Sequence, residues 1–528
     1  MLKVFRILGA TAIGMVIAGC HNSEYYRQQR VAKARKDFKK INKKTIAKDK
    51  VFTLNECIRT ALKHNLSLKV YDLKEQIASE KVTARLLGML PELNVNNQFK
   101  ARSGTPGAKS VSIETGQLSL ESSRSINNTI NNINIELAIS ILDFGLAYFN
   151  AVQQEDRRLI TIEQKRRAAQ NLVFDVVKTY FKVAAAQDAI ETTELLLDKC
   201  RKLEKVFIEL NKDQSVTPFR LLDERKRFIR LEKGLMSYRR NYQDSCIELR
   251  SLMGYVPKED IKVDTRWLKN LNTVDLPSVE VLEKIALTER PELYQLDFES
   301  DILVTEARKT ILTMLPNARL FVDVTNSNNS FLYAQTWNKV AINAAYNLLR
   351  LPQRMAQYAA TNAQIDEISM RTLALSIGIM AQVRMAHANI MEVKQRFDLD
   401  DRIYKAYKKH LKAASLSYKS GNSLSQLEMD RLELETAETF INRLVSMSNY
   451  YVAYYRMLNT VGIKDLSPKT VTQVITEIRR VEAKKTNTSI AGKSKDFSEL
   501  QKFDKKKQKA QKSGNKELDK VIPELVQR

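Results

Sequence analysis

The chain has 528 residues, of which 86 are Lys or Arg and 61 are Asp or Glu, for a formal charge of +25 at neutral pH. Only 15 residues are Gly and 10 are Pro, under five per cent of the chain, against about twelve per cent on average, which indicates long uninterrupted elements. Two flanking segments carry most of the net charge, residues 27–50 with +9 and residues 479–528 with +8. Charge confined to the tails argues against nucleic-acid binding, and no nucleic-acid partner is expected.

Residues 1–19 have the form of a secretory signal. Lys3 and Arg6 precede an apolar run over residues 7–17, and small residues precede Cys20. Eleven apolar residues are too few to span about 30 Å of hydrocarbon as a helix. Ala18-Gly19-Cys20 resembles the lipobox of bacterial lipoproteins, which implies a diacylglyceryl and acyl (palmitate) lipid on Cys20. A plain signal peptide or a short anchor is the alternative.

Residues 20–50 are predicted to be a lipidated N-terminus and basic linker. The Lys-rich composition with few aromatic residues favours a disordered or extended segment. Anionic lipid head groups beside the anchor would attract its charges. No later stretch approaches 18 consecutive apolar residues.

A unit of helix, hairpin and long helices occurs twice. Residues 61–91 align without a gap on residues 286–316, with nine identities in 31 positions, where composition predicts about two. Both segments end in Leu-Pro, which favours extended backbone and should end the opening helices. Thr53 and Glu56 form a T-x-x-E capping box at the start of the first helix. Residues 51–277 and 278–464 are therefore predicted to be two structural repeats.

Each repeat then contains a strand hairpin, over residues 91–143 and 316–350. Aliphatic residues alternate with mostly polar ones at period two, typical of a strand with two different faces. They are Leu93, Val95, Ile133, Ile135, Leu137, Ile139, Ile141, Leu320, Val322, Val324, Val340 and Ile342. The pattern fits a soluble sheet with one face on a core, and equally a membrane barrel. Four strands per chain cannot close a barrel, so closure would require oligomerisation.

Very long helices follow the hairpins. Residues 146–211 contain neither Gly nor Pro, and residues 353–420 contain only Gly378. Some 66 residues in a helix measure about 100 Å. Each helix is expected to turn back into a second one, over residues 219–254 and 424–462. Residues 465–528 form a C-terminal segment whose basic tail is expected to be disordered.

In these features the chain resembles the outer-membrane efflux (TolC-like) family, in its lipoprotein branch. The resemblance rests on residues 52–58, the two Leu-Pro helix ends, residues 142–145, Thr217-Pro218 and the turn at Gly421, and it covers residues 51–464. The family implies a homotrimer in the cell outer membrane. Four strands from each chain would close a twelve-stranded β-barrel, and the long helices would form an α-barrel projecting into the periplasm. An equatorial region would include residues 255–277 and part of the C-terminal segment.

The resemblance also implies the function. The trimer would be the passive exit duct of a tripartite efflux or secretion system, engaged by a periplasmic adaptor (membrane fusion) protein and an inner-membrane transporter. The alternative is a non-conducting outer-membrane lipoprotein that acts as a periplasmic coiled-coil scaffold. No enzyme is expected, because no catalytic carboxylate pair, Cys/His set or Gly-rich phosphate loop occurs. Apart from the lipid, no cofactor or metal is expected, since the cysteines and histidines lack ligand spacing.

In family members, acidic side chains narrow the periplasmic tip shortly after a Gly-containing turn. Here the tip turns are Thr217-Pro218 and Gly421. The sixth residue after Gly421 is Leu427, and the sixth after Gln214, which replaces Gly in the first repeat, is Arg220, so the family's usual Asp is absent twice. Asp223 and Asp430, equivalent at an offset of 207 residues, remain as gate or selectivity candidates, together with Glu428. A ring of carboxylates would attract cations, and Arg220 would neutralise part of it. Alternatively, these charges line a solvated helix face.

Overall fold

The computed structural model describes residues 23–43, 46, 50–119, 121–212, 218–258, 261–269, 271, 273, 275–419, 426–464 and 468–491. The described residues divide into two compact units. Unit 1 contains the described residues within Met1–Ser67, Ala169–Ile285 and Gln382–Arg528. Unit 2 contains the described residues within Leu68–Ala168 and Ala286–Ala381. Each repeat of the sequence therefore contributes residues to both units.

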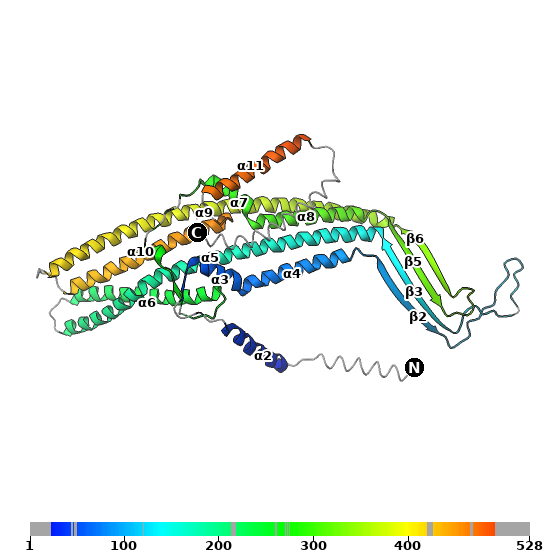
Figure 1. Cartoon of the computed structure of the whole chain (residues 1–528), viewed down its shortest axis with the longest axis horizontal. Helices are drawn as coiled ribbons and strands as arrows, with labels where there is room; N and C mark the ends of the chain where they lie inside the picture. The colour runs from blue at the N-terminus through cyan, green and yellow to red at the C-terminus, as the bar shows by residue number, and fades with distance from the viewer. Residues whose placement is uncertain are drawn as a thin grey trace. The chain divides into compact units, whose positions relative to one another are not determined.

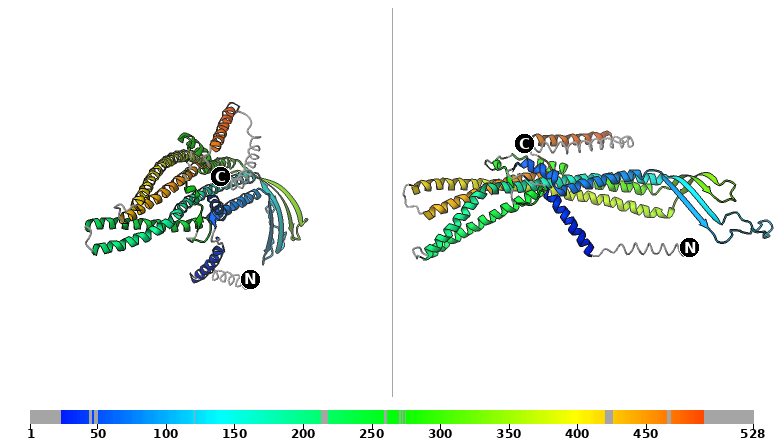
Figure 2. Two further views of the ribbon diagram at one scale, coloured as in Figure 1. Left: turned by 60° about the vertical axis from the view of Figure 1, so that its left-hand side comes forward. Right: turned by 60° about the horizontal axis from the view of Figure 1, so that its bottom comes forward.

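Unit 2 contains a four-stranded antiparallel sheet, β2 (Glu92–Ala101), β3 (Thr129–Ser140), β5 (Asn317–Ser327) and β6 (Thr336–Ala345). Its order is β2-β3-β5-β6, so the two hairpins meet along β3 and β5, as Figures 1 and 2 show. The predicted strands are confirmed, except that Ile141 begins a helix. The 102–128 connection of the first hairpin contains a further turn, with bridges Ala108–Ser123 and Val111–Leu118.

The opening helix of each repeat is broken in two, which the sequence analysis did not predict. The first repeat has α3 (Leu54–His64) and α4 (Leu66–Leu87), and the second has α7 (Val279–Glu289) and α8 (Pro291–Leu312). Asn65 is extended (φ −62°, ψ 125°), and its side-chain amide donates to the Leu252 carbonyl. Pro291 lacks the N–H that would continue α7. The capping box at Thr53 and Glu56 is confirmed.

The predicted long helices are confirmed. They are α5 (Ile141–Lys212) with α6 (Pro218–Leu252), and α9 (Leu351–Lys419), after the 3₁₀ turn η2 (Leu348–Arg350), with α10 (Gln426–Val461). Within unit 1, α6 packs on α5, where the Tyr238 hydroxyl donates to the Ala185 carbonyl at 2.9 Å. Similarly, α10 packs on α9, where Arg443 Nε lies 2.5 Å from Asp401 Oδ1.

The core of unit 1 lies where these helices meet a small parallel strand pair. β1 (Val51–Phe52) pairs with β4 (Lys262–Val263), which precedes the 3₁₀ turn η1 (Arg266–Leu268). The ring of Phe181 stacks on that of Tyr451 at 4.8 Å between centroids. Tyr180, fully buried, donates its hydroxyl to the Asp264 carbonyl. Val263 and Asp264, the latter directly after β4, are thereby held against α5.

Both flanking segments contain helix, where disorder was expected. Helix α2 (Ser23–Asn42) occupies most of the basic linker, so the expectation of an extended or disordered segment is wrong for those residues. Helix α11 (Pro468–Ala491) likewise extends into the basic tail, and Cys20 and the rest of the tail lie outside the described residues. Among the described helices, none has the length and apolar character needed to cross a membrane.

Candidate functional site

The sheet of unit 2 has one aliphatic face. Opposed residues of an antiparallel ladder lie on the same face, and the pairing aligns Leu93, Leu137, Val322 and Val340 in one row across all four strands. A neighbouring row joins Ile139, Leu320 and Ile342. These side chains are exposed, Leu93 to 66% and Val340 to 69%. Nothing among the described residues covers this apolar surface.

The other face of the sheet is polar and ion-paired. Arg319 Nη2 lies 2.6 Å from Glu136 Oε1 on the adjacent strand. Lys339 Nζ lies 3.8 Å from Asp323 Oδ2 and over the ring of Phe321. Asn134 donates to the Thr325 hydroxyl oxygen at 2.9 Å. The sheet therefore separates an apolar surface from a polar, hydrogen-bonded one.

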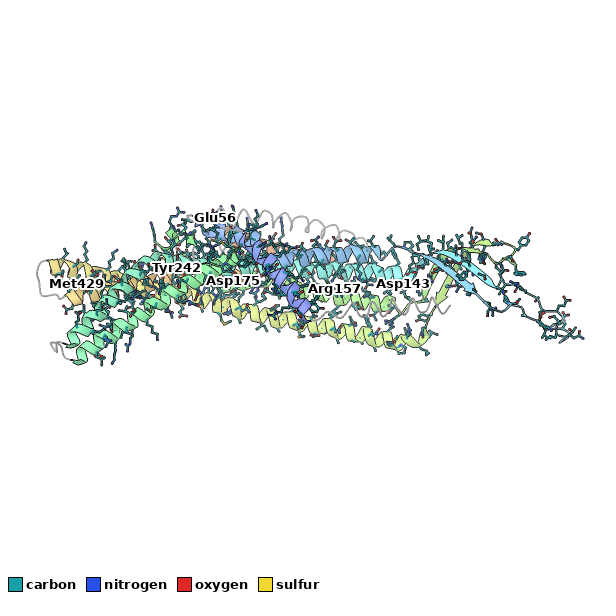
Figure 3. The ribbon with its side chains drawn as sticks, turned by 90° about the horizontal axis from the view of Figure 1, so that it is seen from below. Glu56, Asp143, Arg157, Asp175, Tyr242 and Met429 are labelled. Atoms are coloured by element: carbon teal, nitrogen blue, oxygen red, sulfur yellow. The ribbon has the colours of Figure 1, made fainter. Side chains whose placement is uncertain are left out.

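The second candidate region is the hairpin end of the long helices. Asp430 lies in the second turn of α10, directly after Met429 (labelled in Figure 3), and is 9% exposed. Asp223 lies in the second turn of α6 with a side chain 76% exposed, 4.0 Å from Lys226 Nζ. The two equivalent positions therefore differ in environment.

The remaining tip residues are only partly described. Glu428 is exposed in the first turn of α10. Pro218 begins α6 and Arg220 lies in its first turn, but the side chain of Arg220 is outside the described part. Thr217 and Gly421 also lie outside it. The predicted Arg220–Asp223 pair accordingly stays a prediction.

The structure places an unpredicted cation beside Asp430. Lys199, on α5, has its Nζ 2.7 Å from Asp430 Oδ1 and 2.5 Å from Glu433 Oε2. Burial lowers the pKa of Lys199, but its hydrogen bonds to the two carboxylates outweigh burial, so the pKa lies above its usual value. Lys199 is 231 positions from Asp430 and stands among other basic residues, so no sequence signal distinguishes it.

Further ion pairs join the same helices. Arg225 of α6 donates to Glu204 of α5 at 2.6 Å, and Arg227 of α6 lies 3.6 Å from Glu435 of α10. Beside Lys199 is a hollow of about 600 Å³, formed by α5, α9 and α10. Its apolar lining includes Leu195, Leu196, Tyr404 and Phe440. The tip region thus combines charged links between helices with a small apolar hollow.

The described thiols are not suited to nucleophilic chemistry. Cys57, Cys200 and Cys246 are buried and form no disulfide. Burial raises the pKa of Cys57, and burial with the charge of Glu232 raises that of Cys200 to about 11. The thiolate is the nucleophile, and the raised pKa values of Cys57 and Cys200 disfavour it at neutral pH. No cluster of His, Cys, Asp or Glu within the described ranges could hold a metal ion.

The family profile described as "Outer membrane efflux protein" matches residues 57–255. These residues form an outer membrane efflux domain. The match begins in α3 and ends just after α6, so it covers nearly the whole first repeat. This family consists of channels, and the match confirms the prediction that the chain is not an enzyme. No curated protein matches the chain.

Several solved structures of outer-membrane channels share the fold. The open-state MtrE outer membrane channel of Neisseria gonorrhoeae has a TM-score of 0.61 and 16% identity, over 78% of this chain and 89% of that one. The CmeC outer membrane channel of Campylobacter jejuni has a TM-score of 0.60 and 14% identity, over 80% and 88%. CusC has a TM-score of 0.61 and 15% identity, over 80% and 95%.

These likenesses confirm the predicted fold class, mostly helical with antiparallel strands, as in TolC-like channels. They extend over both repeats, whereas the efflux-domain match covers only the first. The second repeat has the same order of elements, from α7 to α10, as the first has from α3 to α6.

Proposed function

We propose that three copies of this chain form a passive exit duct in the outer membrane. The duct would receive its substrate from an inner-membrane transporter through a periplasmic adaptor protein. The four strands of each copy would contribute to a twelve-stranded barrel, and the long helices would project into the periplasm. The efflux-domain match at residues 57–255 and the likeness to outer-membrane channels support this function.

The observation that carries the proposal is the two-faced sheet. Its strands have 10 to 12 residues, and about 9–11 tilted residues span a bilayer. An exposed aliphatic face fits contact with lipid, and the polar face with Arg319, Glu136 and Lys339 fits a water-filled lumen. Strands β2 and β6 each have one neighbour in the sheet. Pairing of β2 with β6 of the next copy would satisfy both edges.

The proposal is tested by adding a charge to either face of the same strand. Lysine in place of Ile135 would face lipid and cost about 2–4 kcal/mol near the bilayer midplane. We expect Ile135→Lys to lose most of the heat-stable trimer in outer-membrane fractions. Asn134→Lys, on the polar face, is the matched control and should retain both the trimer and single-channel conductance in planar bilayers.

The opposite ranking of the two variants would exclude the proposed orientation of the sheet. If the protein without substitutions assembles but does not conduct, the result would instead support the alternative of a periplasmic coiled-coil scaffold. The heat-stable trimer and the single-channel conductance are measured on the same outer-membrane preparations.

We also propose that Cys20 carries the lipid anchor, on the sequence Ala18-Gly19-Cys20. Mass spectrometry of the mature N-terminal peptide should detect a diacylglyceryl group and an acyl chain. Cys20→Ser should lack both masses and lose retention in the membrane when assembly is blocked by Ile135→Lys. An unmodified N-terminal peptide in the parent protein would exclude the anchor.

For the tip, we propose that Asp223 and Asp430 set the cation preference of the narrowest part, with Glu428 and Arg220 modulating it. Support comes from their equivalent positions in the second turns of α6 and α10. Because Lys199 already pairs with Asp430, Asp223→Asn should reduce cation selectivity more than Asp430→Asn. Reversal potentials in a salt gradient measure this difference. Unchanged selectivity in the double variant would rule out an acidic ring.

A further inference from the structure

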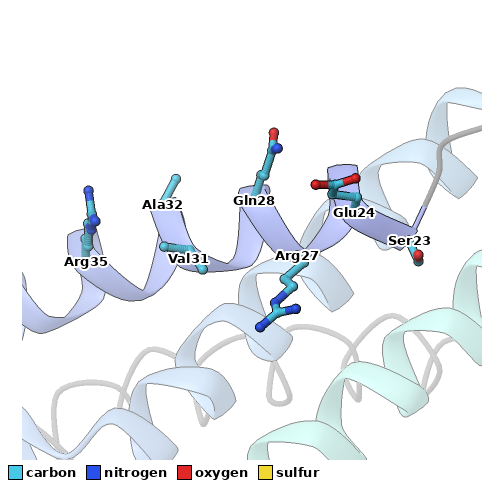
Figure 4. A pocket seen from close by; sticks show the side chains of 7 residues that line it. All are labelled: Ser23, Glu24, Arg27, Gln28, Val31, Ala32 and Arg35. Atoms are coloured by element: carbon cyan, nitrogen blue, oxygen red, sulfur yellow. The ribbon is translucent and has the colours of Figure 1, made fainter.

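Helix α2 is a basic helix whose residues are all exposed. It has seven Lys or Arg against Glu24 and Asp37, a net charge of +5 over 20 residues, and none of its residues is buried. A hollow beside it is lined by seven residues that all belong to α2 (Figure 4). Gln28 and Arg35 leave the helix on one side of that view and Arg27 on the other. Residues 27–42 of the helix are therefore exposed on all sides.

An apolar stripe runs along one side of α2. Val31, Ala34, Phe38 and Ile41 recur at spacings of three and four residues, which places them within about 80° of one another around the axis. Their exposure is high, 68% for Phe38 and 48% for Val31. Arg30 and Arg35 lie on either side of the stripe, and most of the lysines lie on the opposite face. Arg27 points to the same side as the stripe, one turn before Val31, so the apolar stripe is confined to residues 31–41.

We propose that α2 binds an anionic phospholipid surface, with the stripe inserted among the acyl chains and the basic side chains at the head groups. The inference rests on the proposed outer-membrane location, since only two residues separate α2 from the proposed lipid anchor at Cys20. A short tether keeps the helix at the lipid surface. Each basic residue near such a surface strengthens binding about fivefold.

A second copy of α2 fits the stripe less well than lipid does. Stable coiled coils need three to four heptads of apolar residues, whereas the stripe extends over residues 31–41. Packing copies together would also bring together helices that each carry +5. An anionic surface is complementary to that charge, and it accommodates a short stripe.

The test uses the full-length protein reconstituted in vesicles, with a nitroxide label on one residue of α2. Ala34→Cys places the label in the stripe, and Lys36→Cys places it on the opposite face as the matched control. The native thiols at Cys57, Cys200 and Cys246 are buried, which limits background labelling. Collision of the label with oxygen and with a water-soluble nickel complex reports its depth.

In vesicles containing phosphatidylglycerol, we expect the label at position 34 to be reached by oxygen and protected from nickel, and the label at position 36 to show the reverse. In pure phosphatidylcholine, or in 1 M salt, where the screening length is about 3 Å, protection at position 34 should fall. Replacing Lys39 and Lys40 with Gln should lower the ratio of protected to exposed label at position 34 roughly 25-fold.

Equal nickel exposure of the two labels in anionic vesicles would overturn the inference. Dipolar broadening between labels at position 34 would also overturn it, because it would show that copies of α2 pack together. Conductance of the same vesicles tests the proposed function separately. If the vesicles conduct but the label on α2 is exposed to water, only this inference is rejected. If the protein assembles but does not conduct, the proposed exit duct is rejected.

Discussion

Gly254 ends α6 in a conformation that other residues rarely adopt. Its φ is +73°, and Gly462 at the end of α10 has a φ of +86°. The N–H of Tyr255 bonds to the Arg250 carbonyl, and the N–H of Ile463 bonds to the Leu458 carbonyl, which is the Schellman pattern. A Cβ on Gly254 would lie 2.4 Å from the His64 carbonyl oxygen. Backbone of α3 thus approaches α6 closely at this glycine.

Alanine at position 254 should destabilise the protein. The left-handed backbone alone costs roughly 1–2 kcal/mol, and the backbone oxygen of His64 cannot move as a side chain would. Gly234→Ala, inside the same helix with open space around its Cβ position, should instead stabilise by about 0.5–1 kcal/mol. Thermal unfolding followed by helical circular dichroism measures both. An unchanged melting temperature for Gly254→Ala would contradict the close approach.

Lys199 gives a second residue-level prediction. Lys199→Met removes the ammonium shared by Asp430 and Glu433, and should destabilise the protein by about 1–3 kcal/mol. Lys202→Met, on the same helix in an exposed pair with Asp198, should cost under about 1 kcal/mol. Urea unfolding at pH 8 measures the difference.

The pH dependence of this effect has a definite sign. The folded pKa of Lys199 lies above the value of 10.5 taken for the unfolded chain. Its contribution is therefore complete below pH 10.5 and is lost as pH rises through the folded pKa. The Lys199→Met and parent proteins should converge in stability under strongly alkaline conditions, and a constant difference would argue against the ion pair.

At the scale of elements, Asp401 joins α9 to α10. Burial raises its pKa, but hydrogen bonds from Lys405 and Arg443 outweigh burial, so the pKa lies below 3.8. A depressed carboxyl pKa stabilises the fold above the unfolded value, and this contribution is lost as pH falls through the folded pKa. Asp401→Asn should lower stability by about 1–2 kcal/mol at pH 6.

Acid titration of thermal stability checks this prediction. The difference between Asp401→Asn and the parent should shrink below pH 3.8. Glu392→Gln, which alters an exposed pair with Arg396 on the same helix, is the control and should have little effect at any pH. A difference that persists at pH 2 would mean that Asp401 acts by packing and not by charge.

The elements could be predicted from sequence where local signals were strong. The scarcity of Gly and Pro predicted α5 and α9, and alternation at period two predicted the four strands. The break at Asn65 could not be predicted, because it depends on a hydrogen bond to Leu252, 187 residues away. Helix α2 was missed because its Lys-rich composition is shared with disordered segments.

The candidate site was less predictable than the fold. Alignment of the two sequence repeats predicted that Asp223 and Asp430 occupy equivalent positions. It could not predict that their surroundings differ, because the difference depends on Lys199 of α5, which pairs with Asp430 of α10. The aliphatic sheet face followed from sequence, whereas its polar ion pairs, such as Arg319–Glu136, depend on the pairing of β3 with β5. Contacts between distant segments account for what sequence could not supply.

At the scale of the whole molecule, the proposal is that neighbouring copies close the sheet into a barrel. Proline substitutions in β6 test whether this strand is paired on both of its edges. On an edge strand, N–H groups point alternately inward and outward, so a proline is tolerated only where the N–H is unpaired. Val340 and Ala341 are adjacent on β6. If β6 pairs on both sides, Val340→Pro and Ala341→Pro should both abolish the heat-stable trimer in gel assays. Tolerance of one of them would show a free edge.

The strand order β2-β3-β5-β6 also has a consequence for the timing of folding. Each hairpin lies within one repeat and can form locally, but β3 meets β5 through pairs such as Asn134 and Thr325, 191 residues apart. Closing so long a loop carries an entropic penalty and slows formation. The seam between the hairpins cannot form before the elements from α5 to α8, which lie between β3 and β5 in the chain, have been synthesised. Until then β3 and β5 each have an unpaired edge, and a newly exported chain has to be protected from edge-to-edge association during this interval.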